Sequence, residues 1–178
     1  MAFDAFLYFP GSSLVIGESQ DDEMNKHRAF ELRSFEFGAE NILNIGSETG
    51  GGGAGKATFK QFQVTKKTDT ASCGIFHTLC TGTHFDEAIL ELRRSGGSAQ
   101  RSGATFMKIH FRLVMVEDMQ WSGSEGEDVL EETVIFQYGA IKIEYFKQDK
   151  SGKMTKASGG QGEVKWSRVK NKADYVIA

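Results

Sequence analysis

The sequence predicts a mainly β protein in which about eight to ten strands form a closed or nearly closed barrel with one short α-helix. Apolar and polar residues alternate along much of the chain, as they do in strands with one buried face. The 178 residues include 21 Gly and 14 Phe but a single Pro, which suits strands joined by glycine-rich turns. Closure into a barrel is expected because it removes exposed strand edges.

The expected strands follow one another from the N-terminus. The first contains Phe3, Ala5, Leu7 and Phe9 at alternate positions. The second run is 30–37. Its alternation slips by one residue at Arg33–Ser34, as a β-bulge would cause. The later runs are 59–64, 88–92, 106–116, 134–136, 141–146 and 164–166, of which 134–136 and 141–146 are joined through Tyr138 and Gly139.

The run at 106–116 differs from the others because it is apolar on both faces for much of its length. Its alternation places Met107, Ile109, Phe111, Leu113 and Met115 on one face. This pattern favours a central strand covered on both sides, or a strand with one face in the core and the other in a contact between chains.

One helix is predicted at about residues 72–81. Ser72 is the expected N-cap, and Gly82 is expected just after the last helical residue. Cys73 and Cys80 lie on the apolar side of this helix, about 10 Å apart, which is too far for a disulfide. They are therefore expected to be two buried thiols.

Three stretches rich in Gly, Ser or Lys are predicted as long loops, at 45–56, 95–104 and 148–162. None of them marks a domain boundary, so residues 1–178 are expected to form a single domain. The first loop contains Gly50–Gly53, which has almost no conformational preference of its own. A loop of this length is usually functional or disordered, and packing on a neighbouring subunit could order it.

Charge and hydropathy exclude several classes of protein. The net charge of −3 rules out a globally basic nucleic-acid binder, and no apolar stretch has the roughly 20 residues of a membrane helix. No Lys or Arg precedes Lys26, so the N-terminus does not resemble a secretory signal. We expect a protein made in the cytoplasm, without membrane insertion, and exported, if at all, without a cleaved signal.

Charges of opposite sign are segregated along the second half of the chain. Seven acidic residues and no basic residue lie in 117–132, whereas eight basic and two acidic residues lie in 147–172. The two segments are interpreted either as solvated loops or as surfaces that face each other across a subunit contact. A basic tail that binds nucleic acid is a weaker third reading, because no aromatic residues are interleaved with the lysines of 147–156.

No motif indicates a nucleotide site. The segment Gly50–Lys56 matches the start of the phosphate-binding pattern G-x-x-x-x-G-K. However, Ala57 stands where Ser or Thr must hold magnesium, and a strand-like pattern follows where a helix should begin. We therefore interpret the segment as a loop and expect no cofactor.

Metal and catalytic sites are not expected either. Cys73, His77, Cys80 and His84 have spacings of zinc ligands, but Gly82 should end the helix before His84, so the four side chains would not converge. Neither G-x-S-x-G nor H-E-x-x-H occurs. Carboxylates such as Glu87 and Glu91 are expected to point outward, without a buried acid–base pair. We expect no catalytic residues, no metal ligands and no enzyme activity.

Glu36 is a separate candidate. It lies between Phe35 and Phe37, so alternation directs its carboxylate away from the face that those rings occupy. If the rings fill the core, Glu36 faces water, a partner or an enclosed channel.

Nine short segments occur in the same order as in one known family. They are residues 1–7, 17–19, 34–38, 51–57, 62–66, 79–84, 90–93, 138–141 and 165–171. In sequence and spacing they resemble haemolysin-coregulated proteins (Hcp), the tube subunits of type VI secretion. The resemblance extends over nearly the whole chain.

The resemblance implies a β-barrel of two packed antiparallel sheets with one helix at its side, assembled into homohexameric rings that stack into tubes. Such a tube carries effector cargo, is capped by a VgrG-type spike protein and lies inside a contractile sheath. It implies that Glu36 lines the lumen and that the inter-subunit loop comprises Gly50, Gly51, Gly52, Gly53, Ala54, Gly55 and Lys56.

The alternative function is a monomeric or dimeric secreted β-barrel that acts as an effector or binds a ligand. A nucleotide-dependent enzyme is a third reading, against which Ala57 and the missing helix argue. A tube subunit needs large subunit contacts, whereas a ligand-binding barrel needs an apolar interior pocket.

Overall fold

The computed structural model describes residues 3–44, 53–94, 103–150 and 153–178. Its elements in chain order are β1 (Phe3–Tyr8), the 3₁₀-helix η1 (Asn25–His27), β2 (Phe30–Glu31), β3 (Ser34–Glu36), β4 (Ala39–Glu40), β5 (Leu43–Asn44), β6 (Gly53–Ala54), β7 (Thr58–Phe59), β8 (Phe62–Lys67), α1 (Thr70–Thr81), β9 (His84–Arg94), β10 (Ala104–Ser122), β11 (Glu131–Gln148), β12 (Met154–Lys156), the 3₁₀-helix η2 (Gly159–Gln161) and β13 (Glu163–Ser167). The predicted mainly β class is confirmed, and the described residues contain one α-helix, as expected.

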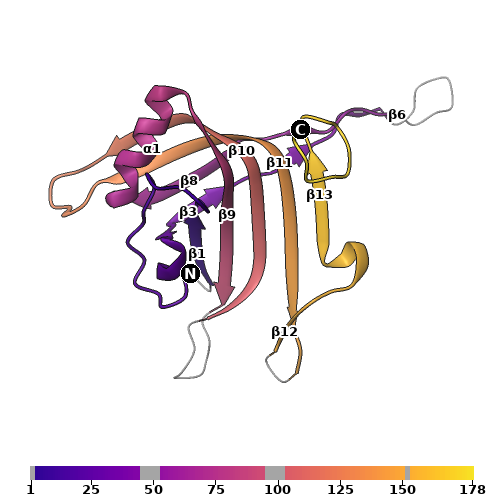
Figure 1. Cartoon of the computed structure of the whole chain (residues 1–178), viewed down its shortest axis with the longest axis horizontal. Helices are drawn as coiled ribbons and strands as arrows, with labels where there is room; N and C mark the ends of the chain where they lie inside the picture. Colours follow the sequence, from indigo (N-terminus) through magenta and orange to yellow (C-terminus); the bar gives the residue numbers. More distant parts are fainter. Residues whose placement is uncertain (1–2, 45–52, 95–102, 151–152) are drawn as a thin grey trace.

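The main sheet is antiparallel and has the strand order β2-β1-β9-β10-β11-β8-β3, with β12 and β13 also paired to β11 (Figure 1). β2 and β3 stand at opposite ends of this order although only two residues separate them. Between them, Leu32 N–H donates to the Ala5 carbonyl (2.8 Å) and Arg33 N–H donates to the Thr65 carbonyl (2.8 Å). The segment 30–36 therefore connects the two ends of the sheet.

This connection corrects one prediction. The slip in alternation at Arg33–Ser34 was expected to be a β-bulge, but it marks the place where the chain changes partner from β1 to β8. Moving from one end of the sheet to the other changes the side of the chain that faces the core.

Stacked phenylalanine rings fill the space between the strands. Phe62, Phe111 and Phe136 are fully buried, and the ring of Phe62 lies 4.3 Å from that of Phe111 and 5.7 Å from that of Phe136. Phe9 packs beside these rings at a tilt, with its ring 5.8 Å from that of Phe136. The core comes from β1, β8, β9, β10 and β11 together, as the alternating apolar residues predict.

Alternation along the three central strands is interrupted at one common level. On each strand, two successive core residues are three positions apart instead of two. These residues are Phe85 and Ala88 on β9, Phe111 and Val114 on β10, and Tyr138 and Ile141 on β11. They are paired with one another across the sheet, and the register is the same on both sides of the interruption. All three strands therefore change face together.

Leu113 lies at this level on β10 and has a φ of 51°, in the left-handed region. A side chain in that conformation costs about 1–2 kcal/mol, which the surrounding packing must offset. Leu113 was predicted to share the face of Phe111, as was Met115, but Met115 is 43% exposed and Val114 takes the core position. β11 passes through the same level as one strand, so the prediction of two strands at 134–136 and 141–146 is wrong.

A second, smaller core lies on the other face of β1 and β9. Residues 10–29 run outside these strands and bury Phe6, Tyr8, Met24 and Ile89 against them. This layer explains an error about Glu91, which was expected to point outward but is 3% exposed.

A hydroxyl and an amine hold the carboxylate of Glu91. It accepts a hydrogen bond from the Tyr8 hydroxyl (3.2 Å) and pairs with Lys108 (3.1 Å). Burial and the nearby Glu91 charge raise the pKa of Tyr8, so this hydroxyl remains a donor at neutral pH.

Helix α1 begins two residues earlier than predicted, at Thr70. Its N-cap is Asp69, whose carboxylate accepts from Ala71 N–H (3.0 Å), while Ser72 Oγ accepts from Asp69 N–H (3.0 Å). This reciprocal capping box replaces the predicted Ser72 cap. Gly82 ends the helix with a φ of 66°, as predicted.

The cysteines on α1 are exposed rather than buried, which corrects a further prediction. The buried side of α1 consists mainly of small residues: Ala71, Ser72, Gly74, Ile75 and Thr78. Small residues allow close approach, and the helix packs with Gly74 against the backbone of residues 14 and 15. The apolar positions of Cys73 and Cys80 therefore lie on the outer side.

Replacing Gly74 with alanine is expected to lower the free energy of unfolding by about 2–3 kcal/mol. Helix propensity alone favours alanine by about 1 kcal/mol. However, a Cβ at this position would lie 2.1 Å from the Leu14 carbonyl oxygen, so backbone would have to move. Urea denaturation measures the change, with the exposed His77→Ala on the same helix as the control. A stabilised Gly74→Ala protein would contradict the close packing.

Candidate functional site

Residues 39–44 and 53–59 form a two-stranded arm that projects from the rest of the molecule (Figure 1). β4 pairs with β7 at its base, and β5 pairs with β6 farther out. Gly55 N–H also donates to the Ile42 carbonyl (3.1 Å). Within the described residues, these four strands pair only with one another. The described strands of the arm therefore extend apart from the main sheet.

The predicted glycine-rich loop maps onto this arm. Gly53 and Ala54 form β6, and Gly55 and Lys56 follow it on the returning side, whereas Gly50, Gly51 and Gly52 lie outside the described residues. Ile42, also on the arm, is 76% exposed. Such exposure of a large apolar side chain on a projecting element is typical of a contact surface.

An apolar cavity of about 330 Å³ opens at the base of the arm. Phe37 and Phe59 line it on the arm side, and Ile143, Val164 and Trp166 line it from β11 and β13. Val164, one of the apolar side chains that line it, is 56% exposed. The cavity is open to the surface, whereas the interior of the barrel is filled by aromatic rings.

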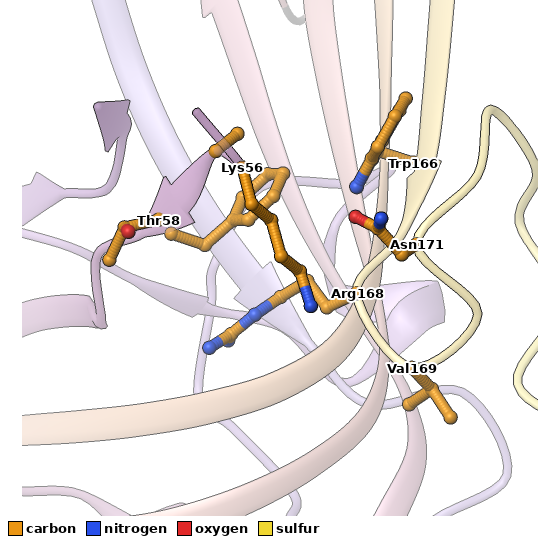
Figure 2. Close-up of a pocket in the computed structure, with 8 residues that line it drawn as sticks. Lys56, Thr58, Trp166, Arg168, Val169 and Asn171 are labelled. Carbon is orange, nitrogen blue, oxygen red and sulfur yellow. The ribbon is translucent and has the colours of Figure 1, made fainter. Parts of the chain in front are cut away.

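A second cavity of about 420 Å³ lies beside the first and has a different character. We call it the cationic pocket; it is lined by Lys56, Ala57, Thr58, Phe59, Trp166, Arg168, Val169 and Asn171. Figure 2 shows Lys56 extending from the arm toward Arg168, with Trp166 and Asn171 on the side of β13. Its lining contains two basic side chains and no acidic one.

Neighbouring groups fix Arg168 in this pocket. Its guanidinium donates to the Tyr138 carbonyl (2.8 Å) and lies over the rings of Tyr138 (4.8 Å) and Phe59 (5.7 Å). Burial raises the pKa of Tyr138, and the charge of Arg168 opposes that rise. Neither Arg168 nor Lys56 forms an ion pair with any carboxylate in the described part of the chain.

Glu36 lies on β3 and is not among the residues that line the two cavities. It is exposed, while Phe35 and Phe37 on either side pack against the core with their rings 6.3 Å apart. The structure confirms that Glu36 points away from these rings. The prediction that it lines a lumen concerns an assembly and stays a prediction.

The cysteine and histidine candidates for a metal site are not brought together in the part of the chain that the structure describes. Among residues 3–44, 53–94, 103–150 and 153–178, no group of three or more His, Cys, Asp or Glu side chains is placed to hold a metal ion. His84 lies near Asp86, at 3.8 Å, on an exposed part of β9. In the same described ranges, no helix has both the length and the apolar character needed to cross a membrane.

The two cavities at the base of the arm were not predicted from the sequence. Their lining comes from four separate parts of the chain, around residues 37, 58, 142 and 166. One signal was available, because Trp166 and Arg168 stand together in a segment that is otherwise rich in lysine and polar residues.

Comparison with known proteins places this architecture in a family. The family model described as "Type VI secretion system effector, Hcp" matches residues 6–145. The chain is 27% identical over 116 residues to protein hcp1 of Pseudomonas aeruginosa, a stretch that covers 65% of this chain and 68% of that protein.

Solved structures agree over almost the full length. One described as a type six secretion system protein has a TM-score of 0.83 and 32% identity, and the match covers 97% of this chain and all of that chain. Hcp1 from Salmonella typhimurium has a TM-score of 0.71 and 25% identity, with 98% of this chain and all of that chain covered. The family match and the shared fold together show that this chain belongs to the Hcp family of type VI secretion proteins.

Proposed function

We propose that this protein is the structural subunit of a type VI secretion inner tube, in which hexameric rings stack and carry effectors. Family membership supports a role in type VI secretion. The observation that carries the proposal is the apolar cavity at the base of the arm, together with the exposed Ile42 on the arm itself. Apolar surface of this kind is stabilised when a second copy covers it.

In this proposal, the arm contacts neighbouring subunits through Gly50–Lys56. A glycine-rich segment orders only at a high entropic cost, which contacts with another subunit would offset. Glu36 faces the lumen, where an acidic side chain would meet passing cargo. The described geometry supports this role for Glu36 because the side chain is exposed and its neighbours hold the strand against the core.

The proposed partners are further copies of the chain, a VgrG-type spike protein, a contractile sheath and effector cargo. The subunit would be made in the cytoplasm and exported through the type VI apparatus without a cleaved signal. Its role would be structural and not enzymatic. The filled interior supports this reading over a ligand-binding barrel, since Phe62, Phe111 and Phe136 occupy the space that a ligand would need.

The mass of the purified protein in solution tests the proposal. Six chains of 19.7 kDa give about 118 kDa, which light scattering after size exclusion separates clearly from a monomer or dimer. We expect the hexameric mass, together with annular particles in electron micrographs. A monomer that persists at high concentration would overturn the ring and favour the secreted effector or ligand-binding barrel.

A further inference from the structure

The turn between β10 and β11 carries unpaired negative charge. This acidic turn, residues 123–130, contains Glu125, Glu127 and Asp128, all of them exposed. None of the three forms an ion pair with another described residue. Val129 and Leu130, which follow them, are 44% and 47% exposed. The turn thus combines three free carboxylates with two apolar side chains.

The cationic pocket has the complementary combination. Lys56 and Arg168 supply two positive charges without a carboxylate partner among the described residues, and Asn171 adds an amide. Trp166 and Val169 supply the apolar part, with Val169 58% exposed. The two surfaces therefore carry opposite charges, and both also present apolar side chains.

The two surfaces cannot meet within one molecule. In Figure 1 the acidic turn forms the tip of the β10–β11 hairpin at one side, whereas β13 and the C-terminus lie at the opposite side. Arg168 and Asn171 follow β13 directly in the chain. A contact between them must join two copies. A contact of this head-to-tail kind closes into a ring when the rotation between copies permits it.

We propose that the acidic turn of one copy docks into the cationic pocket of the next copy. The proposal rests on the proposed ring and names the surfaces that fix its order. Arg168 is well suited to receive a carboxylate, because Tyr138 and Phe59 already hold its guanidinium in place and little side-chain freedom remains to be lost. Charge complementarity of this kind mainly sets orientation and the rate of encounter.

Zero-length cross-linking tests the contact directly. A carbodiimide joins a lysine amine to a carboxylate only where the two touch, so the assembled protein should give a cross-link between Lys56 and Glu125, Glu127 or Asp128. Assembly from mixed ¹⁵N-labelled and unlabelled chains shows whether the link joins two copies. Lys56→Arg is the matched control, since it keeps the charge but removes the reactive amine. Assembled wild-type protein without this cross-link would overturn the proposal.

Charge reversal tests how much the contact between the acidic turn and the cationic pocket contributes to assembly. Glu127→Lys with Asp128→Lys should raise the dissociation constant of the assembly at least about tenfold, since like charges would face each other at the pocket. The control variant, Asp22→Lys with Asp86→Lys, changes the net charge equally at exposed positions elsewhere. Its dissociation constant should stay within about twofold of the wild-type value. Adding Lys56→Glu to the first pair should recover part of the loss. Because all these positions are exposed, circular dichroism should show unchanged folding.

These experiments distinguish failure of the docking proposal from failure of the proposed hexameric ring. If the reversed variant assembles as well as its control, the docking proposal fails while the hexamer stands. If the wild-type chain does not assemble at all, the proposed function and the docking contact both fail.

Discussion

Replacing Lys66 with methionine is expected to lower the free energy of unfolding by about 3–5 kcal/mol. Lys66 is 1% exposed, and its amine contacts the carboxylates of Glu132 (2.8 Å) and Asp69 (2.7 Å). It also donates to Ser72 Oγ (3.1 Å) and lies 4.8 Å from the centre of the Phe30 ring. Methionine keeps most of the volume but leaves the fully buried Glu132 carboxylate without a counter-charge.

Chemical denaturation at a fixed protein concentration measures this loss, because assembly shifts the apparent stability. Lys67→Met is the matched control: this neighbouring side chain is exposed, and its change is expected within about 0.5 kcal/mol. Combining Lys66→Met with Glu132→Leu removes both charges and should recover much of the stability. If Lys66→Met were as stable as Lys67→Met, the buried pair would not hold α1 to the sheet.

Removing Gly50–Gly53 is expected to reduce hexamer formation at least tenfold while the barrel stays folded. The reason is that the arm pairs only with itself in the described residues and contributes little to the core. The expected result is a shift from the hexameric to the monomeric mass in light scattering, with an unchanged circular dichroism spectrum. A deletion variant that still forms full hexamers would show that the arm is not a subunit contact.

A substitution on the described part of the arm refines that experiment. Ile42→Asp should also weaken assembly, because it places a charge on the most exposed of the large apolar side chains in the described part of the chain. Ile16→Asp, at a residue that is 42% exposed on the body, is the matched control and should leave the hexamer intact. Loss of assembly in both variants would indicate a general effect of removing apolar surface.

The sequence predicts those parts of the fold in which one physical signal dominates. The run at 88–92 was expected to be a strand and lies in β9, with Ala88, Leu90 and Leu92 together in the main core, because alternation places side chains two residues apart on one face. The cap of α1 was misplaced because Asp69 and Ser72 can both cap a helix, and only their reciprocal hydrogen bonds decide between them. Local signals therefore identify elements better than their ends.

Buried charge and the candidate site depend on residues far apart in the chain. Glu132 was counted with an acidic segment interpreted as solvated or as a subunit surface, since nothing nearby in sequence identifies Lys66 as its partner. The glycines predicted a long loop at 45–56, but they predicted neither the paired strands of the arm nor the cavities at its base, because Phe59 and Trp166 are brought together only by the folded sheet. Tertiary pairing supplies that information.

The common level at which β9, β10 and β11 change face restricts where the gene can gain or lose codons. The intervals Phe85–Ala88, Phe111–Val114 and Tyr138–Ile141 are held in register with one another. Gaining or losing one codon in any one interval would exchange the buried and exposed faces of the rest of that strand, while its two neighbours kept theirs. Related genes should therefore vary in length at the hairpin ends and in the arm, and keep these three intervals constant.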